Sequence, residues 1–329
     1  MIERSQSVDF HLTPFRVWLD DPDITEICVN RPGEVWCERT GSWERHDSEA
    51  LTLAHLNALA VAVAKYGHNA ISDSRPILAG NLPAGERVHL VRSPACESGT
   101  LSVTIRKPTT DRITIDTFDE QGFFDHVEPA GERVARGNDE LSGLLEAGQH
   151  REFLTRAVAL DRVVVVAGET GSGKTTLMKA LTDWIPTDQR IITIEDVPEL
   201  ELPNHPNHVH LFYPSEATDD SPVTAAKLLK SCMRMKPTRI MLAECRGAET
   251  YDFINSAASG HGGSITSCHA GSCSMTFERM ALMMLQNRQG RALPYDVIMR
   301  MLRDVIDVVV HVHVDAEHGR HITEVWFQP

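Results

Sequence analysis

The pattern of apolar and polar positions changes character near the middle of the chain. The first part mixes one clear amphipathic helix with short apolar segments separated by turn residues, whereas from Leu141 onward apolar runs of strand length alternate with helical patterns. This alternation predicts a mainly parallel sheet with helices on both faces. We therefore expect a smaller α+β domain over residues 1–106, a linker over residues 107–139 and an α/β domain over residues 140–329.

The first domain is predicted to have antiparallel character. A helix is expected over residues 51–66, where apolar residues recur every three or four positions, and a shorter one over residues 9–20. Turn residues such as Arg31-Pro32-Gly33 and Pro83-Ala84-Gly85 separate the other apolar segments. The strands predicted between these turns are 24–30, 34–39, 77–82, 87–91 and 101–106.

The second domain is predicted to alternate its elements to the end of the chain. Its strands are expected at residues 162–167, 190–194, 209–212, 239–243, 264–269, 305–314 and 322–327. Its helices are expected at residues 149–160, 174–184, 222–235, 247–259, 274–288 and 294–303. Because ligands of open α/β sheets bind at the carboxyl ends of the strands, the residues that follow each strand are the candidates for function.

Composition and charge narrow the function classes. In 329 residues, 46 acidic side chains outnumber 32 basic ones, which gives a formal net charge of −14. Such a surface disfavours wrapping of nucleic acid or binding to anionic lipid. The chain contains no apolar run of membrane-spanning length and no apolar signal segment at its start, so we expect a cytoplasmic protein.

One glycine-rich segment directly follows the apolar strand at 162–167. It reads Gly168-Glu169-Thr170-Gly171-Ser172-Gly173-Lys174-Thr175-Thr176 and leads into a predicted helix. A strand, a turn of the form G-x-x-x-x-G-K-[ST] and a helix together predict a loop that binds nucleoside triphosphate. The backbone N–H groups and the helix amino terminus would bind phosphate oxygens, Lys174 would reach the β- and γ-phosphates, and the Thr175 hydroxyl would hold Mg²⁺.

Acids and a histidine follow three other strands. Glu195 comes after strand 190–194, Glu244 after strand 239–243, and His269 ends strand 264–269. Carboxylates near a Mg²⁺–triphosphate can support the metal and orient the attacking water, and a histidine can donate to the γ-phosphate. Each acid could instead merely cap the helix that follows it.

Taken in order, these motifs resemble those of the secretion and traffic ATPases, hexameric motors of type II and type IV secretion and of type IV pili. The resemblance rests on the phosphate-binding loop and on the segments Ile194-Glu195-Asp196, Arg239-Ile240-Met241-Leu242-Ala243-Glu244 and Gly260–His269. The first half resembles the type IV secretion branch through Ile27-Cys28-Val29-Asn30-Arg31-Pro32-Gly33-Glu34, Leu82-Pro83-Ala84-Gly85-Glu86-Arg87 and Ser102-Val103-Thr104-Ile105-Arg106. Ala243, Gly262 and Ser267 depart from the commoner family residues, each by a small or isosteric change.

The resemblance implies a role for each matched residue. Glu195 would position the attacking water, Glu244 would act as an atypical Walker B acid near Mg²⁺, and His269 would lie near the γ-phosphate. Three arginines would contact the nucleotide: Arg87, Arg106 and Arg234. A planar guanidinium can bracket phosphate oxygens and offset charge that develops on them.

The same resemblance implies a fold, an assembly and a location. The second domain would be a RecA-like P-loop NTPase domain, with ATP held between the two domains of one subunit and the subunits arranged in a homohexameric ring. The protein would hydrolyse ATP with Mg²⁺ and power pilus assembly, or transfer of protein or DNA–protein substrates, in a bacterial type IV secretion system. It would dock peripherally on the cytoplasmic face of the inner membrane, on channel components that include other ATPases, with no sequence-specific binding of nucleic acid.

Two other functions stay open at this point. A RecA-like translocase on nucleic acid could share the same core, although the acidic balance disfavours it. A nucleotide switch with low turnover is the other alternative, but the sequence lacks the Asn-Lys-x-Asp motif that reads guanine. Four histidines near the end of the chain, His311, His313, His318 and His321, are interpreted as part of a solvated strand face.

Overall fold

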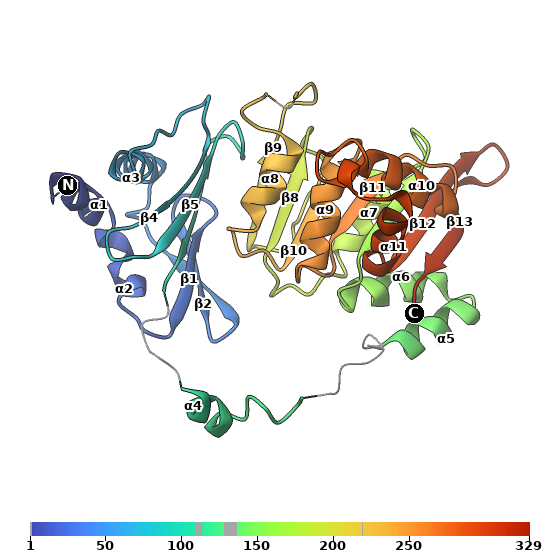
Figure 1. Ribbon diagram of the computed structural model, residues 1–329, viewed down its shortest axis with the longest axis horizontal. Helices are drawn as coiled ribbons and strands as arrows, with labels where there is room; N and C mark the ends of the chain where they lie inside the picture. The colour runs from blue at the N-terminus through green and yellow to red at the C-terminus, as the bar shows by residue number, and fades with distance from the viewer. Residues whose placement is uncertain (1, 109–113, 128–136, 219) are drawn as a thin grey trace.

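The computed structural model describes residues 2–108, 114–127, 137–218 and 220–329, and it shows two domains side by side (Figure 1). The predicted α/β class is confirmed, with an α+β domain ahead of a domain built on a mainly parallel sheet. Part of the predicted linker lies outside the described residues. In the part that is described, helix α4 (Ile115–Glu120) has no buried side chain.

The first domain contains an antiparallel sheet of six strands in the order β3-β2-β1-β6-β5-β4. All five predicted strands are present, and β3 is an addition that the sequence did not predict, because its polar residues are mostly exposed. The helix predicted at 51–66 is α3, which packs against α1. The elements are α1 (Ile2–His11), η1 (Thr13–Phe15), α2 (Arg16–Leu19), β1 (Ile24–Val29), β2 (Glu34–Arg39), β3 (Ser42–Asp47), α3 (Leu53–Tyr66), β4 (Ile77–Asn81), β5 (Arg87–Arg92) and β6 (Leu101–Arg106).

The second domain contains a sheet of seven strands in the order β13-β12-β7-β11-β10-β8-β9, in which only β13 runs antiparallel to its neighbour. The strands are β7 (Val164–Gly168), β8 (Ile191–Glu195), β9 (His208–Phe212), β10 (Arg239–Cys245), β11 (Ile265–Cys268), β12 (Val308–Asp315) and β13 (Gly319–Phe327). The helices are α5 (Asn138–Glu146), α6 (His150–Ala159), α7 (Lys174–Thr182), α8 (Ala225–Cys232), α9 (Glu249–Ala258), α10 (Cys273–Met284), η2 (Gly290–Ala292) and α11 (Tyr295–Val305).

The central strands are buried on both faces, as near-continuous runs of valine and isoleucine require. In β7, Val165 belongs to the core under α8, α9, α10 and α11, whereas Val164 and Val166 belong to the core under α5, α6 and α7. The two faces of the sheet are therefore covered by different helices (Figure 1). Within the described part of the chain, no helix combines the length and the apolar character needed to cross a membrane.

The first domain packs against β9, the edge strand of the second sheet. Cys96 forms an antiparallel bridge with Leu211, and the N–H of Phe212 donates to the carbonyl of Ala95 over 3.0 Å. Val91, Ala95 and Cys96 are buried in the same apolar cluster as the second domain's core. The two domains thus share a small apolar core at this edge.

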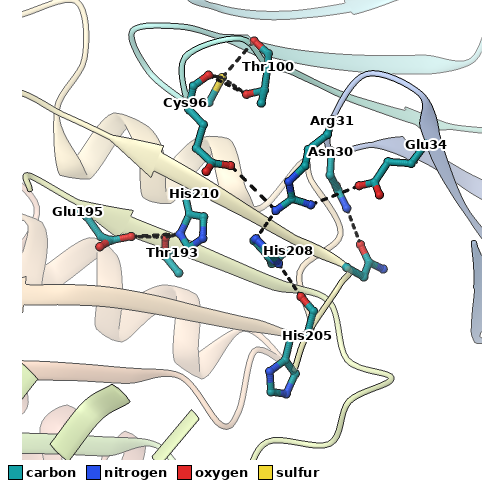
Figure 2. Close-up of polar contacts among 12 residues, drawn as sticks. Asn30, Arg31, Glu34, Cys96, Thr100, Thr193, Glu195, His205, His208 and His210 are labelled. Carbon is teal, nitrogen blue, oxygen red and sulfur yellow. Dashed lines mark hydrogen bonds and ion pairs between the residues drawn. The ribbon is translucent and has the colours of Figure 1, made fainter. Parts of the chain in front are cut away.

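A buried polar network reinforces this interface (Figure 2). Arg190, fully buried in the second domain, donates from Nη1 to the side-chain oxygens of Asn30 at 2.7 Å and of Asn207 at 2.5 Å. Arg31 donates to Nε2 of His208, whose Nδ1 donates to the carbonyl of residue 205 over 2.5 Å. Burial, with the charge of Arg31, lowers the pKa of His208 to about 3. The contact therefore requires the neutral imidazole.

Candidate active site

The phosphate-binding loop joins β7 to α7, and its conformation favours glycine at two positions, Gly168 because of a close backbone contact and Gly173 because of its positive φ. A Cβ on Gly168 would lie 2.3 Å from the carbonyl oxygen of Val312 in β12. Gly173, with φ of +103°, caps the amino terminus of α7. A Cβ on Gly173 would lie 3.2 Å from Cδ of Arg320. The loop thus presents backbone N–H groups at a helix amino terminus, which is an anion-binding arrangement.

Lys174 is the first residue of α7 and is largely buried. Its Nζ donates to the carbonyl of Glu169 over 2.9 Å and lies 3.3 Å from Nδ1 of His269. Burial lowers the pKa of Lys174, and the nearby carboxylate of Glu244 partly offsets this effect. The ammonium group is therefore held against the loop, where phosphate oxygens would bind.

A continuous series of polar contacts runs from this lysine across the carboxyl ends of the strands. From His269, Nε2 lies 3.1 Å from Oε1 of Glu244, and Oε2 of Glu244 lies 3.0 Å from Nη2 of Arg246. Arg246 in turn pairs with Asp196. We call Lys174, His269, Glu244, Arg246 and Asp196 the polar chain. Its members come from the ends of β7, β11, β10 and β8, which are neighbours in that order.

The structure thus brings together three of the residues named from sequence: Lys174, Glu244 and His269. Sequence reasoning missed Asp196 and Arg246 as members of the group. Their position at the carboxyl end of a strand, which also pointed to Glu244, could have identified them. Asp196 directly follows β8, and Arg246 directly follows β10. The carboxyl ends of parallel strands meet at one edge of a sheet, so polar residues there converge.

Glu195 does not join the polar chain, and it is fully buried. Its Oε1 accepts from the Thr193 hydroxyl at 2.6 Å and lies 3.2 Å from Nδ1 of His210 (Figure 2). Its Oε2 accepts from the N–H groups of residues 199–200, both over 2.8 Å. Burial raises the pKa of Glu195, but these hydrogen bonds outweigh it and the net shift is downward. Both carboxylate oxygens are therefore occupied, Oε1 by β8 and β9 and Oε2 by the segment that carries Asp196.

The three arginines named from sequence lie elsewhere. Arg87, Arg106 and Arg234 line one cavity of about 840 Å³ between the domains. The same cavity is lined by Thr238 and His261, which precede β10 and β11 and so lie at the amino ends of these strands. The phosphate-binding loop follows the carboxyl end of β7. The expectation that one subunit's own arginines reach its own phosphate-binding loop therefore does not fit this arrangement.

Two further arginines lie at the loop, and local sequence gave no sign of either. Arg320 of β13 donates from Nε to the carbonyl of Gly171 over 3.1 Å. Arg279 of α10 lines a cavity of about 380 Å³ together with Thr170 and His269. Arg320 reaches the loop because β12 pairs with β7, and β13 pairs with β12. Its position therefore depends on the order of the strands in the sheet.

The remaining loop residues present donors suited to a hydrated cation and to phosphate. Glu169, Thr170 and Thr176 are exposed, and Thr175 is half-buried. The Thr175 hydroxyl and the Glu244 carboxylate are hard oxygen donors of the kind that Mg²⁺ prefers. The residues present therefore fit a Mg²⁺–nucleotide.

Comparison with known proteins gives concordant matches along the whole chain. The family described as Type II/IV secretion system protein matches residues 13–324. A type IV secretion system protein VirB11 from Brucella abortus biovar 1 (strain 9-941) is 64% identical over 332 residues, which cover 100% of this chain and 92% of that protein. The type IV secretion system protein PtlH from Bordetella pertussis is 46% identical, over 99% of this chain and 96% of the other.

A solved structure is similar over almost its full length. It is the crystal structure of the VirB11 ATPase from the Brucella suis type IV secretion system in complex with sulphate. It superposes with a TM-score of 0.95 at 63% sequence identity, covering 99% of this chain and 96% of that chain. This chain and that ATPase therefore share the same arrangement of helices and strands.

Proposed function

The chain belongs to the type II/IV secretion system protein family, and from this premise we propose that it is the ATP-hydrolysing motor of a bacterial type IV secretion system. The observation that carries the proposal is the polar chain, which starts at the phosphate-binding lysine and ends at Asp196. A site that only bound nucleotide would need the loop alone. An acid and a histidine placed against the lysine are what hydrolysis additionally requires.

Each residue of the polar chain has a distinct task in this proposal. Lys174 binds the β- and γ-phosphates and offsets the charge that develops on the γ-phosphate during in-line attack by water. Glu244 orients the attacking water, and His269 would lie near the γ-phosphate with its two ring nitrogens against Lys174 and Glu244. Arg246, itself paired with Asp196, fixes the second carboxylate oxygen of Glu244, so the other oxygen stays in a constant position. Preorganisation of this kind lowers the barrier because no reorientation is needed during the reaction.

We also propose that the nucleotide is ATP with Mg²⁺. Thr175 and Glu244 would hold the ion, Glu244 through water, and the bound ion would supply charge neutralisation at the β- and γ-phosphate oxygens. The backbone of residues 168–173 and the side chain of Thr176 complete the phosphate contacts. Glu195 acts indirectly in this proposal, because its carboxylate positions the segment that follows β8.

The position of Arg87, Arg106 and Arg234 favours a site that is built from more than one subunit. These side chains lie at the opposite edge of the sheet from their own loop. If they contact nucleotide, they contact one that is held by another copy of the chain, as a head-to-tail ring permits. We therefore keep the homohexameric ring as a proposal and assign the arginines to a neighbouring subunit's nucleotide.

The motor would act on the cytoplasmic face of the inner membrane, docked on channel components that include other ATPases. Docking through protein is consistent with the formal charge of −14, which disfavours direct adhesion to anionic lipid. The work done would be pilus assembly or the transfer of protein or DNA–protein substrates.

Steady-state phosphate release tests this function. We expect Mg²⁺-dependent hydrolysis of ATP that does not increase when DNA is added, and an oligomer in the presence of ATP. A strong stimulation by DNA would instead favour the nucleic-acid translocase. Turnover that is no faster in wild type than in Lys174→Ala and Glu244→Gln would favour the low-turnover switch.

A further inference from the structure

The tip of the β12–β13 hairpin gathers a carboxylate and two imidazoles. Asp315 ends β12, and His318 and His321 lie in the turn and at the start of β13. One ligand atom from each of the three residues lies within 4.8 Å of the others. Oδ1 of Asp315 accepts from the N–H of Glu317 at 3.0 Å and of His318 at 2.6 Å, so the turn itself fixes the carboxylate.

The spacing of these atoms fits a small tetrahedral ion. Nδ1 of His318 lies 3.5 Å from Oδ1 of Asp315, and Nε2 of His321 lies 3.8 Å from Oδ2 of the same carboxylate. Ligands held about 2.0–2.2 Å from a tetrahedral Zn²⁺ lie roughly 3.3–3.6 Å apart. The two distances to Asp315 are within a few tenths of an ångström of that spacing, and the three ligand atoms, at most 4.8 Å apart, would draw together around a bound ion.

The outer contact of His321 matches that of a metal-bound histidine, and His318 has a carboxylate near its outer nitrogen beyond hydrogen-bond distance. Nδ1 of His321 donates to the carbonyl of Gly319 over 3.1 Å, which leaves the lone pair of Nε2 towards Asp315. Nε2 of His318 lies 3.8 Å from a carboxylate oxygen of Glu317. A carbonyl or carboxylate on the outer nitrogen is the usual support of a metal-bound imidazole, because it fixes the ring and raises its basicity.

We propose that Asp315, His318 and His321 form a binding site for Zn²⁺, which this hairpin holds outside the nucleotide site. Two imidazoles and one carboxylate favour a late first-row divalent ion over Mg²⁺ or Ca²⁺. The side chain of His318 is 59% exposed, so water completes the coordination. His313 pairs with His321 across the hairpin, with ring centroids 5.8 Å apart, and provides a further imidazole beside the site.

The interpretation of these histidines as one solvated strand face is wrong for His311, which is buried with 5% of its surface exposed. Alternation along β12 groups His311 with His313, but the ligands instead come from the turn and from β13. Arg320, which donates to the carbonyl of Gly171, immediately precedes His321 in β13, so the two side chains leave opposite faces of the hairpin.

Zn²⁺ titration of the full chain without a histidine tag tests the site. Calorimetry with ZnCl₂ at about pH 7.5 would be run in an excess of MgCl₂. We expect wild type to bind one Zn²⁺ that the His318→Ala/His321→Ala double variant does not bind, and each single variant to bind at least ~10-fold more weakly. Visible d–d absorption of added Co²⁺ should appear in wild type and be lost in the double variant.

The matched control is His150→Ala, which removes an exposed histidine from α6 and should leave the titration unchanged. All of these proteins keep the same cysteines, so zinc bound by thiols would appear equally in each. Circular dichroism would verify that the double variant is folded. If wild type binds no Zn²⁺, or if the double variant binds it with the stoichiometry and affinity of wild type, the proposal is overturned.

Discussion

His269 and Glu244 lie 3.1 Å apart, from Nε2 to Oε1, although they come from the ends of two different parallel strands. The other ring nitrogen of His269 lies 3.3 Å from Nζ of Lys174. The imidazole therefore separates the phosphate-binding ammonium from the acid that would orient water. Lys174, His269 and Glu244 contact one another in a row, so removing any one side chain changes the surroundings of the other two. The effects of the three substitutions on hydrolysis should therefore not be additive.

Lys174→Ala and Glu244→Gln should each reduce ATP hydrolysis by about 100-fold or more, since each removes a preorganised charge at the reacting phosphate. Lys174→Ala should also weaken nucleotide binding, whereas Glu244→Gln should leave it nearly unchanged. Phosphate release and binding of a fluorescent ATP analogue would measure the two effects. Lys179→Ala, on the same helix but paired with Glu201, is the matched control and should be nearly as active as wild type.

Arg246→Ala should lower kcat about 10-fold while KM for ATP changes little, because Arg246 holds Glu244 in position without contacting the loop. Arg246→Lys should not restore activity, since one ammonium group cannot replace two guanidinium nitrogens that bind Glu244 and Asp196 separately. Steady-state kinetics would separate kcat from KM. The exposed Arg288 provides the control substitution. An equal change in both Arg246 variants and Arg288→Ala would contradict the positioning role.

Glu195→Gln should destabilise the fold by about 1–3 kcal/mol, because the amide keeps one acceptor oxygen where the carboxylate uses two, so one set of hydrogen bonds is lost. The pKa of Glu195 is lower in the folded state than its ordinary value of 4.5, so its contribution to stability is present above that pH and is lost as the pH falls below it. Urea unfolding at neutral and at acidic pH would measure this. The difference between wild type and variant should shrink on acidification; a constant difference would argue against the ionised carboxylate as its source.

Mixed oligomers can test whether Arg106 serves another subunit. Arg106→Ala and Lys174→Ala should each be nearly inactive alone. If a site takes its lysine and its arginine from neighbouring copies, random mixing in equal amounts restores both wild-type residues to about a quarter of the sites. Recovery of activity on mixing, measured as phosphate release, is the expected result. No recovery, with both variants shown to co-assemble, would place the two residues in one subunit's site or remove Arg106 from the site altogether.

Acidification should weaken the contact between the domains. The pKa of His208 is about 3 in the docked state and 6.5 ordinarily, so between these values the undocked state takes up a proton that the docked state does not. The groups that face this imidazole are Arg31, Arg190 and His210, so a second positive charge there is unfavourable. We expect small-angle scattering to show separated domains more readily at about pH 5.5 than at about pH 7.5.

The matched variant for this prediction is His208→Gln, whose amide can accept from Arg31 and donate to a carbonyl without titrating. Its domain contact should depend less on pH over the same range. The same pH dependence in wild type and in His208→Gln would assign the effect to other groups, such as His89, whose pKa is lowered to about 4 chiefly by burial.

Sequence predicted the elements that depend on local patterns. The buried strands appear where β-branched runs occur, and the loop at Gly168 to Thr175 lies between a strand and a helix as its motif requires. Strand β3 was not predicted, because Ser42–Asp47 is a polar edge strand. Backbone pairing with β2 stabilises it in place of buried side chains. Local pattern thus predicts elements well where burial decides them.

The parts of the site that sequence could not predict depend on how segments far apart in the chain are placed next to one another. Glu195 and Asp196 are adjacent, yet one points into a buried hydrogen-bond network and the other joins the polar chain. Which residue faces the nucleotide depends on where the strand ends. The position of Arg106 depends on how the first domain docks, and Arg320 depends on β12 lying beside β7, neither of which leaves a periodic signal in sequence.

The bridge between Cys96 and Leu211 has a practical consequence for separating the domains. In the full chain the loop before β6 shields part of the open hydrogen-bonding side of β9. A fragment starting near residue 140 would leave this strand ready to pair with the same strand of another molecule. Such a fragment should self-associate through its sheet edge, and kinetic work on an isolated second domain would then describe aggregates, not the motor.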